Sequence, residues 1–354
     1  MEQYLTILQN ILDNGREKES GRPNMPNTIG LSRATVLMNL QDGYPLLTTK
    51  KMFWKGIVHE LLWFLRGETN IKYLVDNGVN IWNGDAYRWY QKHYEKDGRD
   101  KLYMFSMDEF IEKIKNGELT YISKHSYKSE SGYKLGDLGK VYGYQWRNQN
   151  GVDQIKDIID DLKNNPFGRY KILDGWNKRD FPEMALPPCH LLYQFIVRPM
   201  TLVERYNYLM NSCSSDEWVE KHLSEPKSHE YFDSCDVPKY FLDLNMYQRS
   251  VDTFLGAPFN LASMSLLLII VAKTVGMLPG KTFWIGGDTH IYKDHIDVVK
   301  EQLEREPMEL PQMIINKELN SLEDIENLTI NDFELKNYKS HSKLKAKLFT
   351  GYKK

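Results

Sequence analysis

Cysteine is scarce in this sequence, which limits the covalent and metal chemistry open to the chain. Only three cysteines occur among 354 residues, at positions 189, 213 and 235. An odd number of widely spaced cysteines forms no disulfide framework and fits a reducing cytoplasm. A zinc site made by Cys213, Cys235 and His229 is an alternative, but their spacing is irregular for zinc ligands, so we expect no metal.

The sequence also lacks a strong charge of either sign and any very long apolar run. Its formal net charge is −2, which gives no electrostatic footprint for a polymeric nucleic acid but leaves single nucleotides open as ligands. The most apolar stretch, 261–275, is shorter than the roughly 20 residues that a membrane span needs. We therefore expect a buried core helix there and no membrane association.

Nothing in the composition divides the chain into parts. It has no Pro/Gly/Ser-rich linker, block of like charge or internal repeat, and 41% apolar with 27% charged residues is ordinary for a globular protein. The amino-terminal residues lack the basic and apolar pattern of a secretory signal, and instead place Leu5, Leu8, Ile11 and Leu12 on one face of a helix. We expect one domain over residues 1–354, located in the cytoplasm.

Helices and strands are mixed along the chain without a regular alternation. Helices are predicted over 54–66, 152–163 and 290–303, and strands over 191–197 and 240–249. Apolar and polar residues alternate in the second strand, which predicts one buried face and one face toward a cavity or solvent. Such a strand suits a sheet that carries a binding site.

One cysteine stands in a setting that suits a nucleophile. Cys189 follows Pro187 and Pro188, whose fixed φ angles and missing N–H groups bring the chain in extended, and an apolar strand comes next. A thiol reacts as its thiolate, which positive charge stabilises, and Arg249 on the later strand is a candidate source of that charge. From composition alone, a small buried apolar cysteine is the commoner interpretation.

A series of motifs in a fixed order favours the nucleophile. Together with the Cys189 and Arg249 segments, these motifs closely resemble the thymidylate synthase family: Gly43 to Lys51, Phe53 to Gly56, His59 to Trp63, Asp137 to Gly143, Gln145 to Arg147, Gly256 to Asn260 and Ile285 to Tyr292. The resemblance covers Met1 to about Phe349 and implies an α+β fold, in which helices pack on a bent mixed sheet and two subunits form a homodimer by stacking their sheets. Two insertions, at about 84–134 and 198–238, interrupt it, and their aromatic residues predict that they pack onto the body.

The resemblance implies a reaction between dUMP and 5,10-methylenetetrahydrofolate that yields dTMP. Cys189 would add to C6 of the pyrimidine and so activate C5, assisted by Arg249. Glu60, in an apolar helix, would relay protons, because an apolar environment raises a carboxyl pKa toward neutrality. Tyr142 would help to remove the C5 proton. A dUMP hydroxymethylase and a non-catalytic nucleotide- or RNA-binding homologue are the alternatives.

The family's nucleotide-binding positions fall on ten residues of this chain: Arg22, Arg169, His190, Gln248, Arg249, Ser250, Asp252, Asn260, His290 and Tyr292. Asn260 would select uracil, because a carboxamide matches O4 and N3–H of that base. Arg169 would reach the phosphate of the neighbouring subunit, and Tyr170 stands where the family has a second arginine.

Each of these assignments has a structural alternative. Arg22 and Arg169 also read as solvated charges. Asn260 is well placed to cap a helix that begins at Leu261, and His290 with Tyr292 also reads as a packing pair at a helix start.

The folate-binding positions that the resemblance implies are Lys50, Ile81, Trp82, Asp252, Leu255, Gly256 and Phe259. Asp252 would hold the pterin, the apolar residues would form a wall, and Lys50, as an exposed lysine at the mouth, would meet the glutamate tail. The family chain stops at a short apolar tail that covers the folate, whereas this chain continues past Phe349 to Lys354. A leaky cover would let water compete with hydride, so the hydroxymethylase alternative stays open here.

Overall fold

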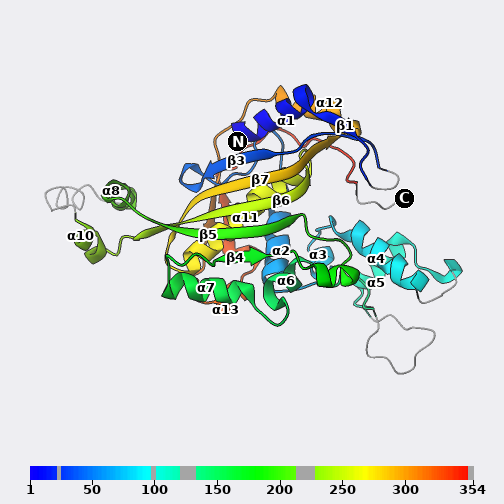
Figure 1. Cartoon of the computed structure of the whole chain (residues 1–354), viewed down its shortest axis with the longest axis horizontal. Helices are drawn as coiled ribbons and strands as arrows, with labels where there is room; N and C mark the ends of the chain where they lie inside the picture. Colours follow the sequence, from blue (N-terminus) through cyan, green and yellow to red (C-terminus); the bar gives the residue numbers. More distant parts are fainter. Residues whose placement is uncertain (22–24, 97–100, 120–132, 213–227, 350–354) are drawn as a thin grey trace.

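A seven-stranded sheet runs across the middle of the molecule (Figure 1). The computed structural model describes the chain except for residues 22–24, 97–100, 120–132, 213–227 and 350–354. The strands of the sheet are β1 (Arg16–Lys18), β2 (Thr28–Leu31), β3 (Ala34–Asn39), β4 (Ile172–Asp174), β5 (His190–Pro199), β6 (Tyr240–Asp252) and β7 (Leu278–Tyr292). Their order is β1-β2-β7-β6-β5-β4, with β3 also paired to β7. A separate hairpin pairs β8 (Gln312–Ile315) with β9 (Phe333–Lys336).

The sheet is mixed, because β6 and β7 run parallel while the other pairs are antiparallel. A parallel pair needs a long crossover, and α11 (Gly256–Thr274) provides it. The predicted α+β class is therefore confirmed.

The remaining helices surround this sheet. They are α1 (Glu2–Asn14), α2 (Trp54–Leu65), α3 (Lys72–Asp76), α4 (Asn83–Lys96), α5 (Met107–Lys115), α6 (Tyr142–Asn148), α7 (Gln154–Asn164), α8 (Leu202–Ser212), α10 (His229–Ser234), α12 (Ile296–Leu303) and α13 (Leu322–Glu326). Figure 1 shows α2 and α11 on the same side of the central strands. α11 contacts both β6 and β7, and it also contacts α2.

The apolar stretch 261–275 forms the greater part of α11, as predicted. By length and composition α11 could cross a membrane, and among the described helices it alone passes that test. It is 67% buried inside the protein, and Leu266, Leu268 and Ile270 are fully buried in the main core. The contacts of α11 are those of a core helix.

The opposite face of the sheet carries exposed apolar residues. A line of register partners crosses it from Leu37 through Phe283, Asn245 and Gln194 to Ile172. Leu37 is 48% exposed and Ile172 is 36% exposed. Ile196 and Tyr247, on β5 and β6, are also exposed.

Most predicted elements are confirmed, and one is wrong in part. The helices predicted at 54–66 and 152–163 and both strands agree with the structure to within a few residues. The helix predicted over 290–303 begins only at Ile296, because β7 continues to Tyr292. Tyr292 pairs with Thr28 of β2, so two neighbouring strands hold this end of β7 extended.

The two insertions pack in different ways. In the first, Tyr87, Tyr90 and Phe110 of α4 and α5 join the main core. In the second, α8 and α10 form a small separate cluster around Leu209 and Phe232. Figure 1 shows α8 and α10 projecting beyond the end of the sheet. The expectation that both insertions pack onto the body is therefore right for the first and wrong for these two helices.

Candidate functional site

A cavity of about 710 Å³ lies where the ends of β6 and β7 meet the start of α11. Twelve of the predicted site residues line it: Lys50, Glu60, Ile81, Cys189, Ser250, Asp252, Leu255, Gly256, Phe259, Asn260, His290 and Tyr292. They come from α2, β6, β7, α11 and the segments between these elements. The fold thus gathers residues that are more than two hundred positions apart in the chain.

Cys189 lies directly before β5, beside an arginine from β6. The guanidinium of Arg249 donates from Nε to the carbonyl of Pro188 at 2.8 Å and from Nη2 to that of Pro187 at 2.9 Å. Nη2 is also 3.6 Å from Sγ of Cys189. Two carbonyls therefore fix a positive charge against the sulfur, which is the setting in which reactive cysteines occur.

Tyr142 supports the same cysteine from the other side. Its hydroxyl accepts a hydrogen bond from the backbone N–H of Cys189 at 2.7 Å, and its ring stacks on that of His190 with centroids 4.4 Å apart. Burial, and then the neighbouring Cys189, raise the pKa of Tyr142 well above its usual value, so its hydroxyl keeps its proton.

His190 is a neutral packing partner in this arrangement. Burial lowers the pKa of its imidazole to about 3. Its Nδ1 is 2.8 Å from the hydroxyl of Tyr193. His190 is absent from the lining of the cavity and lies behind Tyr142.

Glu60 is the one buried carboxyl of the cavity among the described residues. It sits on α2 with 8% exposure, and its Oε1 accepts a hydrogen bond from the indole of Trp82 at 2.7 Å. Burial raises the pKa of Glu60 to about 7, and the Trp82 hydrogen bond offsets only part of that rise. A carboxyl with this pKa can both give and take a proton near neutral pH.

A chain of amides orients Asn260. The indole of Trp284 donates to Oε1 of Gln248 at 2.9 Å, and Nε2 of Gln248 donates to Oδ1 of Asn260 at 2.9 Å. Because an indole N–H can only donate, the orientation of both amides is fixed. The helix begins at Gly256, so Asn260 lies inside it. The alternative that Asn260 caps a helix beginning at Leu261 is wrong.

His290 and Tyr292 lie on β7, so the alternative of a helix-start pair is also wrong. Nδ1 of His290 is 3.3 Å from Oδ1 of Asp288, and Nζ of Lys18 is 2.7 Å from the same oxygen. These two partners, His290 first, lower the pKa of Asp288 to about 2. Neither Asp288 nor Lys18 was predicted as a site residue, because Lys18 lies outside the motifs and Asp288, inside the motif Ile285 to Tyr292, had no role assigned to it.

Lys50 differs from its prediction as an exposed lysine. It is 4% exposed, and its Nζ donates to the carbonyl of Phe254 and lies 3.7 Å from the centre of that ring. Burial lowers the pKa of Lys50 to about 7, although the carboxylate of Asp252 opposes the shift. The chain turns inward before α2, and the periodicity of a short loop cannot reveal such a turn.

Asp252 is held by the turn that leads into α11. Its Oδ1 accepts the backbone N–H groups of Phe254 at 3.0 Å and Leu255 at 3.2 Å. Its Oδ2 is 3.8 Å from Nδ1 of His295. The carboxylate therefore keeps one oxygen turned away from the backbone, at the wall of the cavity.

Six predicted residues of the described chain do not line this cavity: Trp82, Tyr142, Arg169, His190, Gln248 and Arg249. Arg169 is exposed just before β4 and does not line the cavity, and its neighbour Tyr170 is 93% exposed. Lys171 next to them is buried and pairs with Asp161 at 2.7 Å. Arg22 lies outside the described residues.

The carboxyl-terminal residues form one wall that the sequence analysis left open. Residues 343–349 contribute six side chains to the lining of the cavity. The ring of Phe349 packs on Tyr292 with centroids 4.7 Å apart and stacks on His295 at 5.2 Å. The resemblance pointed to an apolar tail over the folate, but the residues that follow Phe349 left open whether the tail covers the cavity in this chain.

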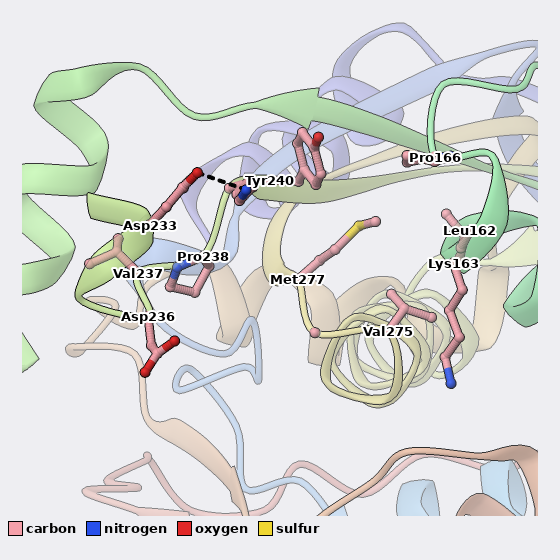
Figure 2. Close-up of a pocket in the computed structure, with 12 residues that line it drawn as sticks. Leu162, Lys163, Pro166, Asp233, Asp236, Val237, Pro238, Tyr240, Val275 and Met277 are labelled. Atoms are coloured by element: carbon pink, nitrogen blue, oxygen red, sulfur yellow. Dashed lines mark ion pairs between the residues drawn. The ribbon is translucent and has the colours of Figure 1, made fainter. Parts of the chain in front are cut away.

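A second hollow, of about 400 Å³, lies at the base of the second insertion (Figure 2). Its walls come from α7, the end of α11 and the link between α10 and β6. Figure 2 shows Val237, Pro238 and Met277 among its lining and the ion pair that Asp233 makes at its side. None of the predicted site residues lines this hollow.

The described residues hold no group of three or more His, Cys, Asp and Glu side chains that could bind a metal ion. The zinc alternative cannot be placed, because Cys213 lies outside the described residues.

Comparison with known proteins gives one consistent result. The family model described as thymidylate synthase matches residues 2–350. Proteins named thymidylate synthase from Mycoplasma mobile and Malacoplasma penetrans are each 40% identical over 348 residues, which is 98% of this chain and 99% of each relative. The thymidylate synthase of Mycoplasma pneumoniae is 38% identical over 350 residues, again 98% of this chain and 99% of the relative.

Proposed function

The chain belongs to the thymidylate synthase family, and we propose that it converts dUMP to dTMP with Cys189 as its nucleophile. It is a methyltransferase, and its cosubstrate is 5,10-methylenetetrahydrofolate. The observation that carries the proposal is the guanidinium of Arg249 at 3.6 Å from Sγ of Cys189, at the wall of a cavity large enough for both substrates.

Cys189 supplies the activation step. Its thiolate forms a bond to C6 of the uracil, and the electron pair moves onto C5 and O4, so that C5 becomes a carbon nucleophile. Arg249 stabilises the negative charge of the thiolate before the attack and again when the sulfur leaves C6. The carbonyls of Pro187 and Pro188 keep the guanidinium in place during both events.

Glu60 and Tyr142 handle the protons. With a pKa of about 7, Glu60 delivers a proton toward O4 and takes it back within one turnover. Tyr142 keeps its own proton at neutral pH, so it acts by holding a water or a hydrogen bond at the position from which the C5 proton departs.

Asn260 reads the base. Gln248 already donates to its Oδ1, so Oδ1 has one lone pair left for uracil N3–H, and the amide N–H faces O4. Cytosine presents the reverse polarity at these two positions and would leave both groups unpaired. Ser250, His290 and Tyr292 face the deoxyribose and phosphate of the nucleotide from the same cavity.

The residues around the cavity fit a folate. Ile81, Leu255 and Phe259 form an apolar wall for flat rings, and Oδ2 of Asp252, which accepts none of the backbone N–H groups that Oδ1 holds, suits the N–H groups of a pterin. The folate supplies the one-carbon unit and the hydride that reduces it to a methyl group. Lys50 lies too deep to meet the glutamate tail from solvent and holds Phe254 beside the rings.

We propose that two copies of the chain form a homodimer through the exposed face of the sheet. The apolar side chains of Ile172, Ile196 and Tyr247 on that face support a stacked interface. Arg169 would then bind the phosphate in the partner's cavity, which accounts for its exposure here. We also propose a cytoplasmic location, on the basis of the few cysteines.

A hydroxymethylase is not favoured. That alternative rested on the extra residues after Phe349, which could have removed the cover of the cavity. Phe349 packs on Tyr292 and His295 with the extension present, so the extension and an apolar cover coexist.

The product assay tests this choice. Purified protein is incubated with dUMP and methylenetetrahydrofolate, and dihydrofolate formed is compared with dUMP consumed. A molar ratio near unity with dTMP as product is expected. Tetrahydrofolate together with 5-hydroxymethyl-dUMP would overturn the proposal.

A further inference from the structure

A buried lysine, Lys171, lies directly before β4, and its side chain is 0% exposed. Its Nζ is 2.7 Å from Oδ2 of Asp161, and it donates to the carbonyls of Asn165 at 2.7 Å and Gly168 at 2.9 Å. An ammonium group has three N–H donors and no acceptor. These three contacts therefore use every donor of the buried charge, as burial of a charge requires.

The two carbonyls belong to the first and last residues of one tight turn. The N–H of Gly168 donates to the carbonyl of Asn165 at 2.9 Å, and Pro166 follows Asn165, where the fixed φ of proline favours a turn. The ammonium of Lys171 therefore binds both ends of the 165–168 turn. Because Asp161 belongs to α7, the same ammonium also ties this turn to the end of that helix.

The backbone of Lys171 is fixed separately, by the sheet. Its carbonyl accepts the N–H of Phe195 on β5 at 3.0 Å. The side chain thus reaches back from a position held by a strand to the carbonyl of Gly168. Between these two fixed points lie Arg169 and Tyr170, which are both exposed. The described contacts therefore close a short loop whose free part is these two residues.

The exposed part of this loop carries a single guanidinium. Tyr170 stands where the family has a second arginine, and Arg169 is the one arginine among residues 165–171. A planar guanidinium binds a phosphate best when it meets two oxygens at once, which requires a defined direction of approach. With one arginine in place of two, the direction of Arg169 matters more.

We propose that Lys171 is a positioning residue for Arg169. By fixing both ends of the 165–168 turn, it holds the backbone of Arg169 in the arrangement that presents the guanidinium to a nucleotide phosphate in the partner's cavity. Binding then needs no further ordering of this loop, which favours affinity. The phosphate as ligand rests on the proposed function. The fixed turn is a property of the ligand-free chain.

Hydrogen exchange of the ligand-free full-length protein tests the fixed turn. Lys171→Met keeps an unbranched side chain of similar length and removes the three donors. The N–H of Gly168, which closes the turn, should then exchange at least about tenfold faster than in wild type, because hydrogen bonds from a charged group are lost. An unchanged rate would refute the role of Lys171 in holding the turn.

Lys163→Met is the matched control for this experiment. Lys163 also belongs to α7, and its Nζ donates to the carbonyl of Asn320, which lies outside the turn. The control should leave the exchange of Gly168 at the wild-type rate. An increase equal to that in Lys171→Met would show that any loss of a lysine at this helix loosens the turn, and would overturn the proposal.

The Kd for dUMP, measured by calorimetry without turnover, tests the link to Arg169. Arg169→Ala should weaken binding by roughly ten- to hundredfold, because it removes hydrogen bonds between charged groups. Lys171→Met should weaken binding at least about threefold, because a smaller fraction of the protein holds the binding arrangement. In the Arg169→Ala background Lys171→Met should change the Kd by less than about twofold. Equal factors in the two backgrounds would show that Lys171 does not act through Arg169.

A second variant keeps the proposal testable if Lys171→Met does not fold. In Gly168→Ala the added Cβ would lie 2.9 Å from Nζ of Lys171, so the ammonium must shift, and the same faster exchange and the same pattern of Kd values are expected. A wild-type protein that binds dUMP but forms no dTMP would overturn the proposed function alone, and the Kd values would still decide the role of Lys171. A folded wild-type protein that binds no dUMP would overturn both.

Discussion

Glu60 and Cys189 acquire their chemistry from opposite surroundings. Glu60 is buried against an indole, which favours its neutral form and brings its pKa to about 7. Cys189 lies against the fixed charge of Arg249, whose Nη2 is 3.6 Å from its sulfur. A single cavity therefore holds a carboxyl that can exchange a proton near neutral pH and a sulfur that faces a positive charge.

The raised pKa of Glu60 makes a prediction about stability. Because the folded pKa of about 7 lies above the ordinary glutamate value of 4.5, wild type loses stability as pH rises between these two values, and the loss is complete above the folded pKa. Glu60→Gln has no such charge to bury. The unfolding free energy of Glu60→Gln minus that of wild type should therefore increase by about 3 kcal/mol from pH 4.5 to 8.

Urea unfolding at several pH values measures this difference. Glu323→Gln, an exposed glutamate on α13, is the control and should follow wild type at every pH. A difference between Glu60→Gln and wild type that does not change with pH would show that folding leaves the pKa of Glu60 unshifted. In the proposed role, Glu60→Gln should also lower kcat by a factor of about 10² to 10⁴.

Asn260 carries a prediction about base preference. In Asn260→Asp a carboxyl replaces the amide, so the N–H that faces O4 is lost, and a protonated or water-bridged carboxyl can accept from the cytosine amino group. The kcat/KM for dUMP should fall at least about tenfold, and activity on dCMP relative to dUMP should rise. Steady-state assays with both nucleotides measure this. Asn10→Asp, at an exposed residue of α1, should keep the wild-type preference. An unchanged preference in Asn260→Asp would show that Asn260 does not recognise the base.

Residues inside motifs were predictable, and residues placed by tertiary contacts were not. The sequence placed Cys189 beside Arg249 and put Glu60 in an apolar helix, because proline chemistry and helical periodicity are local signals. It misjudged the exposure of Lys50, which depends on the ring and carbonyl of Phe254 more than two hundred residues away. Lys18 was missed for the same reason, since its pairing with Asp288 joins β1 to β7, and Asp288 is an exception, because it lies inside a motif and was still missed.

At the scale of elements, β7 shows where periodicity fails. The stretch from 290 to 303 reads as one helix, yet its first residues complete a strand that pairs with β2 on one side and β6 on the other. The helix propensity of these residues is outweighed by the backbone hydrogen bonds of β7 to its two neighbouring strands. α11 shows the reverse case, because an apolar stretch long enough for three or more turns has few alternatives to a buried helix.

The turn that leads into α6 is predicted to tolerate no side chain at Gly139. Gly139 has φ +73°, and an added Cβ would lie 1.9 Å from the carbonyl oxygen of Glu183. Gly78 has the same φ of +73° but nothing within 4 Å, so it isolates the cost of the backbone conformation. Gly78→Ala should lower the unfolding free energy by about 1 to 2 kcal/mol. Gly139→Ala should cost several kcal/mol more, because the backbone of Glu183 must move.

Chemical denaturation of the two glycine variants measures these costs. Gly139→Ala should also weaken turnover, since the same turn delivers Tyr142 to the backbone of Cys189. Equal losses of stability in the two variants would show that the close approach to Glu183 relaxes at no cost.

At the scale of the whole molecule, we propose that residues 1–354 form a single domain. One cluster of buried apolar residues extends from Tyr4 on α1 to Leu344 beside the cavity. The small cluster of α8 and α10 adds a projection to this body. The sequence could predict the position of the insertions and their aromatic residues. Which core each insertion joins depends on contacts between residues far apart in the chain, and local sequence patterns do not reveal such contacts.

The proposed homodimer predicts complementation between two inactive variants. Cys189→Ser lacks the nucleophile, and Arg169→Ala lacks the residue that would reach the partner's phosphate. In a hybrid dimer one of the two sites receives neither change. Each hybrid dimer should therefore have up to about half of the activity of a wild-type dimer. Arg179→Ala, at an exposed arginine that does not line the cavity of Cys189, replaces Arg169→Ala in the control and should be active on its own. No recovery after confirmed subunit exchange would place Arg169 outside the partner's site.

The proposed mechanism depends on a covalent bond between Cys189 and C6 of the pyrimidine. The most direct measurement is intact and peptide mass spectrometry after incubation with 5-fluoro-dUMP and methylenetetrahydrofolate, because fluorine at C5 cannot leave as the proton does and the covalent complex is trapped. Wild type should gain the mass of both ligands on the peptide that contains Cys189, and folded Cys189→Ser should gain none. An active wild-type protein without this adduct, or an adduct that persists in Cys189→Ser, would show that Cys189 is not the nucleophile.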